Sequence, residues 1–216
     1  MMYNPISILH SLTRWLTDTT VLSDVLILTL GTNHVYRLKR TGEIVDNCQK
    51  QPQSWFQEEE LSVDDCAKVL EEAIQQVRNR NANAKVVLTV SPIRYQKYGF
   101  HGSQLSKATL LLATHELVKA GKADYFPAYE IMNDALRDYR FYAEDMLHPT
   151  PQAVNYIWEV FGKAYFSAET HDYLHEWQPI KAALNHRPFD AESDAYKAFR
   201  AKAEQQKQAF LKKWKG

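Results

Sequence analysis

The residues best suited to chemistry lie at positions 145–149, which have the sequence DMLHP. A carboxylate three residues before a histidine can accept the imidazole N–H and fix the tautomer of the ring. The other ring nitrogen is then free to act as a general base. This spacing predicts Asp145 and His148 as an acid–base pair. It also arises by chance, so the alternative is a surface histidine beside an incidental acid.

A second candidate stretch, GTNH at residues 31–34, follows an apolar run that predicts a strand. Ligand sites of open parallel sheets lie beyond the carboxyl ends of the strands. Gly31 lets the backbone approach a substrate there, and the amide of Asn33 can donate to a developing oxyanion. The alternative is an ordinary Gly/Asn turn. Ser91 follows another predicted strand, but Pro92 and the lack of flanking glycines favour a turn over a nucleophile.

His171 and His175 are four residues apart and could share a helix face. Together with Asp145 they give the sequence a possible metal-ligand set. No HExxH or CxxC pattern accompanies them, which favours solvated or partly buried histidines instead. The sequence therefore predicts no metal site and no cofactor.

The elements that must position these residues alternate along the chain. Residues 25–30 (VLILTL) and 85–90 (KVVLTV) are short apolar runs that predict strands buried in a parallel sheet, the first on both faces. A brief strand is expected at 124–126, whereas the long connection at 31–60 has no clear periodicity. Helical patterns stand between the strands, the first with a Ser62/Asp65 capping box. This alternation predicts an α/β fold with a parallel sheet covered on both faces.

Composition narrows the class of protein. The chain has 216 residues, of which 45% are apolar and 24% charged, as in a globular domain with a core. Lys and Arg balance Asp and Glu at 26 each, so we expect no nucleic-acid partner. No apolar run is long enough to span a bilayer, and no signal peptide is evident. Two cysteines make no disulfide framework, and cytoplasm is the expected location.

The character of the chain changes near residue 171. We expect one domain over residues 1–170 and a helical extension over 171–216. The segment 196–216 contains seven Lys or Arg residues and one acid, Glu204. The favoured interpretation is a solvated helix that packs through its aromatic side chains, and the alternative is a surface for an anionic partner.

Taken together, many stretches resemble the GSCFA domain family, a branch of the SGNH/GDSL hydrolase superfamily. The resemblance covers most of residues 3–161 in the expected order. The matching stretches are YNPISI (3–8), LTLGTNHVYRL (28–38), GEIVDNCQKQP (42–52), VVLTVSPIR (86–94), SQLSKATLLLA (103–113) and the long run from 125 to 161 that contains EDMLHP.

The resemblance implies a flavodoxin-like three-layer α/β/α sandwich and hydrolysis of acyl esters. It implies that Asp145 and His148 match the superfamily's late Asp-x-x-His motif, which supplies the base and its orienting acid. Gly31 and Asn33 match the Gly-x-Asn motif of the oxyanion hole by their position after a strand. Asn47 is the alternative oxyanion donor, because many relatives carry a different residue at the position of Asn33.

The chain departs from the family at the motif that gives the family its name. No Gly-Ser-Cys-Phe-Ala stretch occurs in the 216 residues, so no nucleophile is assigned in this chain. The resemblance implies that the first two strands are missing as well. The strand at 25–30 would then be an apolar edge open to water, and we expect aggregation or self-association through it.

Three functions remain open from the sequence. The first is a serine ester hydrolase whose substrate is a small-molecule ester, with an acyl group on a sugar as the superfamily's expectation. The second is a non-catalytic binding module that keeps the fold. The third is a metal-dependent hydrolase that uses His148, Asp145 and the His171/His175 pair.

Overall fold

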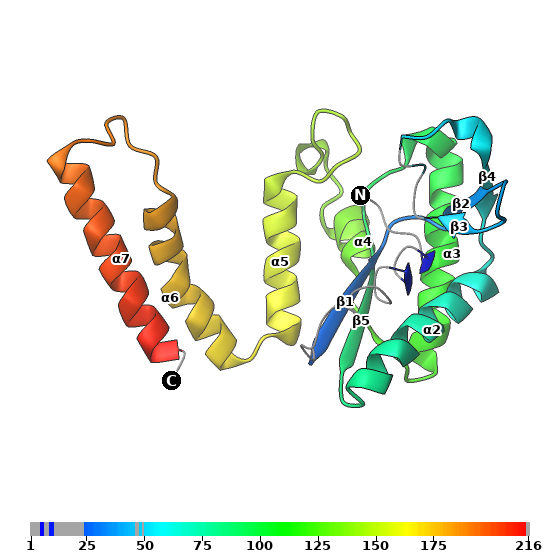
Figure 1. The fold of residues 1–216 in the computed structure, drawn as a ribbon, viewed down its shortest axis with the longest axis horizontal. Helices are drawn as coiled ribbons and strands as arrows, with labels where there is room; N and C mark the ends of the chain where they lie inside the picture. Colours follow the sequence, from blue (N-terminus) through cyan, green and yellow to red (C-terminus); the bar gives the residue numbers. More distant parts are fainter. Residues whose placement is uncertain (1–4, 7–8, 11–23, 46–47, 49, 215–216) are drawn as a thin grey trace. The chain divides into compact units, whose positions relative to one another are not determined.

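The computed structural model describes residues 5–6, 9–10, 24–45, 48 and 50–214 (Figure 1). The chain divides into two compact units, Met1–Ile157 and Trp158–Gly216. The division falls inside helix α5 (Pro151–Tyr165). Both sheets belong to the first unit, whereas the described part of the second unit is helical apart from its connections.

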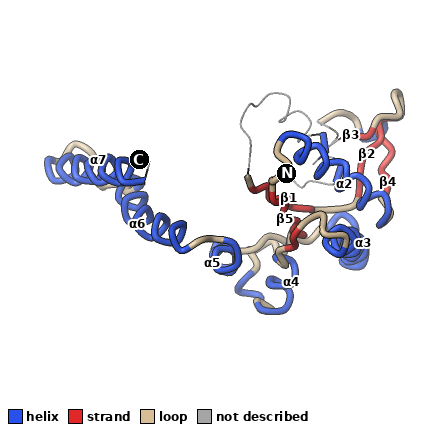
Figure 2. Tube along the Cα trace, turned by 90° about the horizontal axis from the view of Figure 1, so that it is seen from below, coloured by secondary structure: helices blue, strands red, loops and turns tan. Residues whose placement is uncertain are grey.

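The first unit is built on a three-stranded parallel sheet in the order β1-β5-β6. The strands are β1 (Val25–Leu30), β5 (Lys85–Val90) and β6 (Asp124–Tyr125). In the register of β1 and β5, Val25 lies opposite Lys85 and Leu30 lies opposite Val90. All three strands therefore end at the same edge of the sheet. Helices flank the strands (Figure 2), so the predicted α/β class is confirmed and the arrangement is consistent with an α/β/α sandwich.

Two long helices, α2 (Val63–Arg80) and α3 (Gly99–Lys119), connect the strands and form the main core. The capping box predicted for α2 is present, because Ser62 Oγ accepts the Asp65 N–H and Asp65 accepts the Ser62 N–H. One face of each helix packs on one face of the sheet. The fully buried side chains of this core include Leu30, Leu70, Leu88 and Leu110.

Strand β5 is buried on both faces, whereas β1 is not. The prediction that β1 is buried on both faces is therefore wrong. Val25 and Ile27 are 53% and 45% exposed, while Leu28 and Leu30, on the other face, are buried. Among the described residues β1 pairs only with β5, which makes it an edge strand with an apolar face. The expected aggregation through this edge stays a prediction.

A second, antiparallel sheet occupies the connection that the sequence suggested was irregular. Its order is β3-β2-β4, with β2 (His34–Leu38), β3 (Ile44–Val45) and β4 (Phe56–Glu60). The expectation of an irregular segment at 31–60 is therefore wrong. The strands are hard to recognise in the sequence because apolar and polar residues do not alternate clearly along them. Arg37 of β2 and Glu59 of β4, both partly buried, are joined diagonally across the strands by a bidentate salt bridge.

Short helical turns follow β6 and lead to α5. They are α4 (Ala128–Glu130), the π-helical segment η3 (Ile131–Ala135) and the 3-10 turn η4 (Tyr139–Phe141). Two further 3-10 turns lie earlier in the chain, η1 (Gln53–Trp55) before β4 and η2 (Gln96–Tyr98) before α3. Met132, Leu136 and Ala153 form a small separate core under the loop between η4 and α5. This core supports the loop that carries Asp145 and His148.

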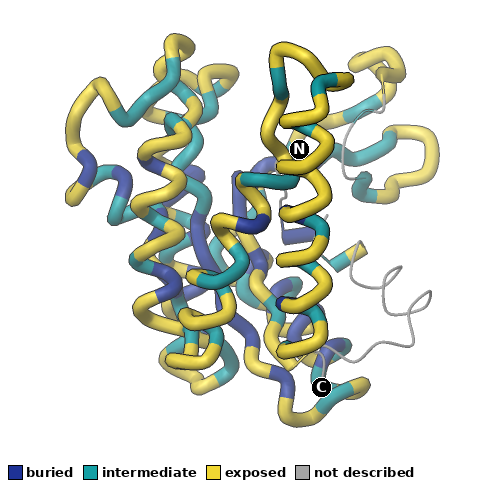
Figure 3. Tube along the Cα trace, turned by 90° about the vertical axis from the view of Figure 1, so that its left-hand side faces the viewer, coloured by how far each residue is buried: buried dark blue, intermediate teal, exposed yellow. Residues whose placement is uncertain are grey.

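In the second unit, helices α6 (Ala168–Asn185) and α7 (Asp194–Trp214) pack together through aromatic rings. Phe210 of α7 is 5% exposed and contacts the rings of Tyr173 and Trp177, with centroids 4.8 Å and 5.1 Å away. Most of their remaining surface is exposed (Figure 3). The α7 cations include Lys213, which pairs with Glu176 at 2.6 Å. Among the described helices, none is long and apolar enough to cross a bilayer.

Candidate active site

The loop between η4 and α5 is a tight turn that presents Asp145 and His148 together. Its ends are joined by an antiparallel bridge between Tyr142 and Pro149. The Ala143 N–H donates to the carbonyl of His148 at 2.8 Å. Met146, between the two candidate residues, has a φ of 59°, in the left-handed region that non-glycine residues seldom adopt. The turn is therefore closed by its own hydrogen bonds.

The Asp145 carboxylate organises this turn with both of its oxygens. Oδ1 accepts the backbone N–H groups of Leu147 and His148 at 2.9 Å and 3.0 Å. Oδ2 lies 2.5 Å from His148 Nδ1. The two backbone N–H donors, followed by the ring, lower the pKa of Asp145 to about 2. The carboxylate is thus charged at neutral pH and favours a proton on Nδ1.

His148 meets the geometric requirements of a general base. With Nδ1 on Asp145, its Nε2 has no hydrogen-bond partner among the described residues. The side chain is 58% exposed, so a reacting group can reach this nitrogen. His148 lies three residues before Pro151, the first residue of α5. The pair can accept a proton from an alcohol or a water molecule.

The Gly31–Asn33 stretch lies at the carboxyl end of β1, also as predicted, and α3 holds it from within. Ser106 Oγ accepts the Asn33 N–H at 3.0 Å and lies 3.1 Å from Thr32 Oγ1. Asn33 is 3% exposed, and its Nδ2 donates one hydrogen to the Leu61 carbonyl at 2.8 Å. Its Oδ1 is buried without a hydrogen-bond partner. Asn33 is therefore held in place with one side-chain N–H uncommitted.

Lys107 is a buried amine that the sequence reasoning missed. It is 3% exposed, and its Nζ donates to the Gly31 carbonyl at 2.5 Å. Burial lowers the pKa of its amine to about 7. The signal was available in the sequence, because Lys107 lies three residues before Leu110 and ten before Leu117, on the buried face of α3. A lysine on an apolar helix face is unusual.

A polar cluster around His34 lies next to this stretch. The His34 ring stacks on Tyr98 with centroids 3.5 Å apart, and burial lowers the pKa of His34. Glu58 accepts hydrogen bonds from Tyr98 and Lys97, while Lys97 also donates to Tyr36. These contacts join the antiparallel sheet to η2.

The loop after β5 touches both candidate regions. The Ser91 N–H donates to the Leu30 carbonyl at 2.8 Å, which places Ser91 beside the end of β1. Ser91 Oγ accepts the Ile93 N–H at 3.4 Å within a turn. Further along the loop, the Arg94 N–H donates to the carbonyl of Leu147 at 3.2 Å. One short loop thus borders the oxyanion candidates at one end and the acid–base loop at the other.

Comparison with known protein families places the chain in one of them. A model of the GSCFA family matches residues 14–161, about two thirds of the chain. The chain belongs to the GSCFA family. A second model, the C-terminal domain of GSCFA domain proteins, matches residues 177–215. No curated protein and no solved structure matches the chain.

The family match contains every residue predicted for the acyl-ester site. Asp145, His148, Gly31 and Asn33 all lie within the matched range. Gly31 and Asn33 follow β1 directly, and the acid–base loop contacts the loop after β5 through the Leu147 carbonyl and the Arg94 N–H. Asn47, the alternative oxyanion donor, lies within that range but outside the described residues. The role of Asn47 as the alternative oxyanion donor in this GSCFA chain therefore stays a prediction.

The histidines predicted as an alternative metal set belong to the second unit. His171 and His175 are both on α6, and the His171 ring packs edge-on against Phe166 at 5.9 Å. In the described part of this GSCFA chain, no three His, Cys, Asp or Glu side chains are grouped so as to hold a metal ion. The metal-dependent alternative therefore gains no support from the structure.

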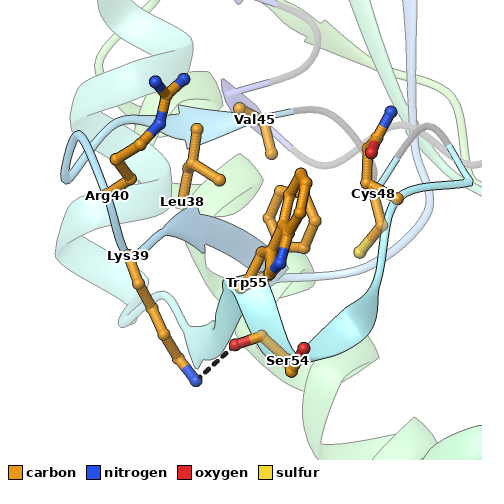
Figure 4. A pocket seen from close by; sticks show the side chains of 9 residues that line it. Leu38, Lys39, Arg40, Val45, Cys48, Ser54 and Trp55 are labelled. Atoms are coloured by element: carbon orange, nitrogen blue, oxygen red, sulfur yellow. Dashed lines mark hydrogen bonds between the residues drawn. The ribbon is translucent and has the colours of Figure 1, made fainter.

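A separate cavity of about 780 Å³ opens on the antiparallel sheet of the GSCFA domain (Figure 4). Trp55 and Phe56 form its apolar wall, and Lys39 Nζ donates to the Ser54 carbonyl at its rim. Its described lining contains neither a carboxylate nor an imidazole. This cavity is therefore not a candidate for acid–base chemistry.

Proposed function

We propose that this GSCFA domain is an acyl-ester hydrolase of the SGNH type, with His148 as its general base. The observation that carries the proposal is the 2.5 Å contact between Asp145 Oδ2 and His148 Nδ1, which leaves Nε2 exposed. A carboxylate that orients an imidazole in this way is the arrangement used in serine hydrolases on unrelated folds. Asp145 holds the tautomer and stabilises the imidazolium that forms during the reaction.

In this proposal the Gly31–Asn33 stretch stabilises the oxyanion. Its backbone is fixed by Ser106 and Lys107, so its donors are positioned before the reaction begins. The second Nδ2 hydrogen of Asn33 and the Gly31 N–H are the proposed donors. Asn47 remains the alternative donor that the family resemblance implies.

The nucleophile belongs to the Gly-Ser-Cys-Phe-Ala stretch, which the 216 residues do not contain. Its serine oxygen would attack the acyl carbon while His148 Nε2 accepts the hydroxyl proton. The tetrahedral intermediate would collapse as His148 returns that proton to the leaving alcohol, leaving an acyl-serine. Water activated by the same nitrogen would then release the acid and restore the serine.

The test requires a polypeptide that carries the family's serine stretch ahead of residues 1–216. Hydrolysis of p-nitrophenyl acetate is measured for this protein and for its His148→Ala and Asp145→Asn variants. His101→Ala is the matched control, because His101 is also an exposed histidine of the first unit. We expect His148→Ala to lower kcat by about 10²- to 10⁴-fold and the control to leave it unchanged. No turnover, or equal rates for the two histidine variants, would refute the catalytic proposal.

The second candidate function is a binding module that uses the same fold without hydrolysis. The basic segment 196–216, with seven Lys or Arg residues and one acid, is the observation that favours it. Ligand binding that is unaffected by His148→Ala, in a serine-containing protein that hydrolyses no ester, would support this function over the first.

A further inference from the structure

A small polar cavity of about 340 Å³ lies beside the acid–base loop. Its seven lining residues come from the loop after β5 and from the stretch 133–146: Arg94, Asn133, Arg137, Asp138, Tyr139, Tyr142 and Met146. Met146 lies between Asp145 and His148 in the chain. The cavity volume is near the lower end of the range for ligand sites and suits a group of about monosaccharide size.

Arg94 is held in the cavity wall by several contacts. Its N–H donates to the Leu147 carbonyl, which fixes the backbone of Arg94 against the acid–base loop. The guanidinium lies over the Tyr142 ring at 4.9 Å and one of its nitrogens is 3.4 Å from the Tyr142 hydroxyl. Tyr142 in turn packs against the small core below the loop. Arg94 is therefore preorganised without a carboxylate partner among the described residues.

Arg137 supplies a second guanidinium. It is exposed, and it has no hydrogen-bond or ion-pair partner among the described residues. Asp138 is the acid in the described lining, and its Oδ1 accepts the Arg140 N–H at 3.0 Å and lies 3.9 Å from Arg140 Nε. Two arginines against one already occupied carboxylate give the cavity a net positive charge.

We propose that this cavity binds an anionic group of the substrate and holds it beside His148. Guanidinium groups match the planar carboxylate and the phosphate or sulfate group through paired charge-assisted hydrogen bonds. That the bound anion belongs to a substrate rests on the proposed hydrolase function. The binding of the anion itself does not depend on turnover. It narrows the substrate class to esters that also carry a negative charge.

The test is calorimetric titration of the 216-residue chain at low ionic strength. The probes are D-glucuronate, its neutral counterpart D-glucose, and inorganic phosphate. We expect saturable binding of glucuronate or phosphate, and binding of glucose at least about tenfold weaker. Arg137→Gln should weaken anion binding about tenfold or more. Arg40→Gln removes an exposed arginine elsewhere in the first unit and should leave it unchanged.

The outcomes separate this proposal from the hydrolase proposal. Binding that is retained in His148→Ala and lost in Arg137→Gln supports the anion site even where no ester is hydrolysed. Tighter binding of glucuronate than of phosphate identifies a carboxylate borne on a sugar, and the reverse identifies a phosphate group. Equal effects of Arg137→Gln and Arg40→Gln on anion binding, binding of glucose as tight as that of the tighter-binding anion, or no saturable binding of either anion would overturn the proposal. Because Arg137 is exposed, its replacement does not endanger folding.

Discussion

Replacing Lys107 with methionine should remove a pH dependence from the stability of the first unit. Burial lowers the pKa of the Lys107 amine to about 7, against 10.5 for an ordinary lysine. Between these two pH values the unfolded chain binds one proton more than the folded chain. The free energy of unfolding therefore rises with pH across this window. The contribution is complete above pH 10.5, is lost progressively as the pH falls from 10.5 towards 7, and is absent below pH 7.

The size of this change in the free energy of unfolding follows from the interval between the folded and unfolded pKa values of Lys107. One pKa unit corresponds to about 1.4 kcal/mol. With a folded-state pKa near 7, the gain between pH 7 and pH 9 is about 2 kcal/mol, because half of the amine is already neutral at pH 7. Methionine fills a similar volume but leaves the Gly31 carbonyl without its donor, which costs about 1–3 kcal/mol at either pH. Wild type should therefore gain stability over the variant as the pH rises.

The assay is urea unfolding followed by circular dichroism at pH 7 and pH 9. The quantity compared is the difference in the free energy of unfolding between wild type and variant, because the contribution of the second unit cancels in this difference. Lys119→Met is the matched control, because Lys119 is exposed on the same helix. The Lys107→Met difference should change by about 2 kcal/mol between the two pH values, and the Lys119→Met difference should not. Equal pH dependence in wild type and Lys107→Met would refute the reasoning.

Three further predictions concern single groups. Hydrogen bonds hold the pKa of Asp145 at about 2, so the ionised carboxylate stabilises the loop fully above about pH 4, and this stabilisation is lost as the pH falls towards 2. In an NMR titration, the amide signals of the loop should shift only in that pH range. Burial raises the pKa of Cys66 to about 12, so a thiol reagent should label Cys48 in the folded chain and Cys66 only after unfolding. Ser62→Ala should lower the free energy of unfolding by about 1 kcal/mol in a urea titration, because it removes the cap of α2.

The elements that the sequence predicted well have their signals within a few neighbouring residues. The strands at 25–30 and 85–90 are apolar runs with clear ends, and both occur at those bounds. The capping box of α2 is a four-residue pattern. The Asp145–His148 contact is equally local, because a carboxylate three residues away reaches the ring within one turn of chain.

The antiparallel sheet could not be recognised in the same way. Its strands bury few side chains on either face, so the alternation of apolar and polar residues that identifies a half-buried strand is weak. β4 carries three consecutive glutamates, which are poor strand formers. What stabilises it includes cross-strand pairing with β2, such as the Arg37–Glu59 salt bridge, and pairing partners are not visible in either strand alone.

The contacts around Gly31 show why the rest of the site escaped prediction. Lys107 is 76 residues from the carbonyl it binds, and Ser106 is 73 residues from the Asn33 N–H. These pairs form only when α3 packs across the end of β1. The acid–base pair, in contrast, is closed within four residues by hydrogen bonds of its own turn. A perturbation of α3 packing should therefore disturb the proposed oxyanion donors while the imidazole keeps its carboxylate, so the two halves of the site can be separated by mutation.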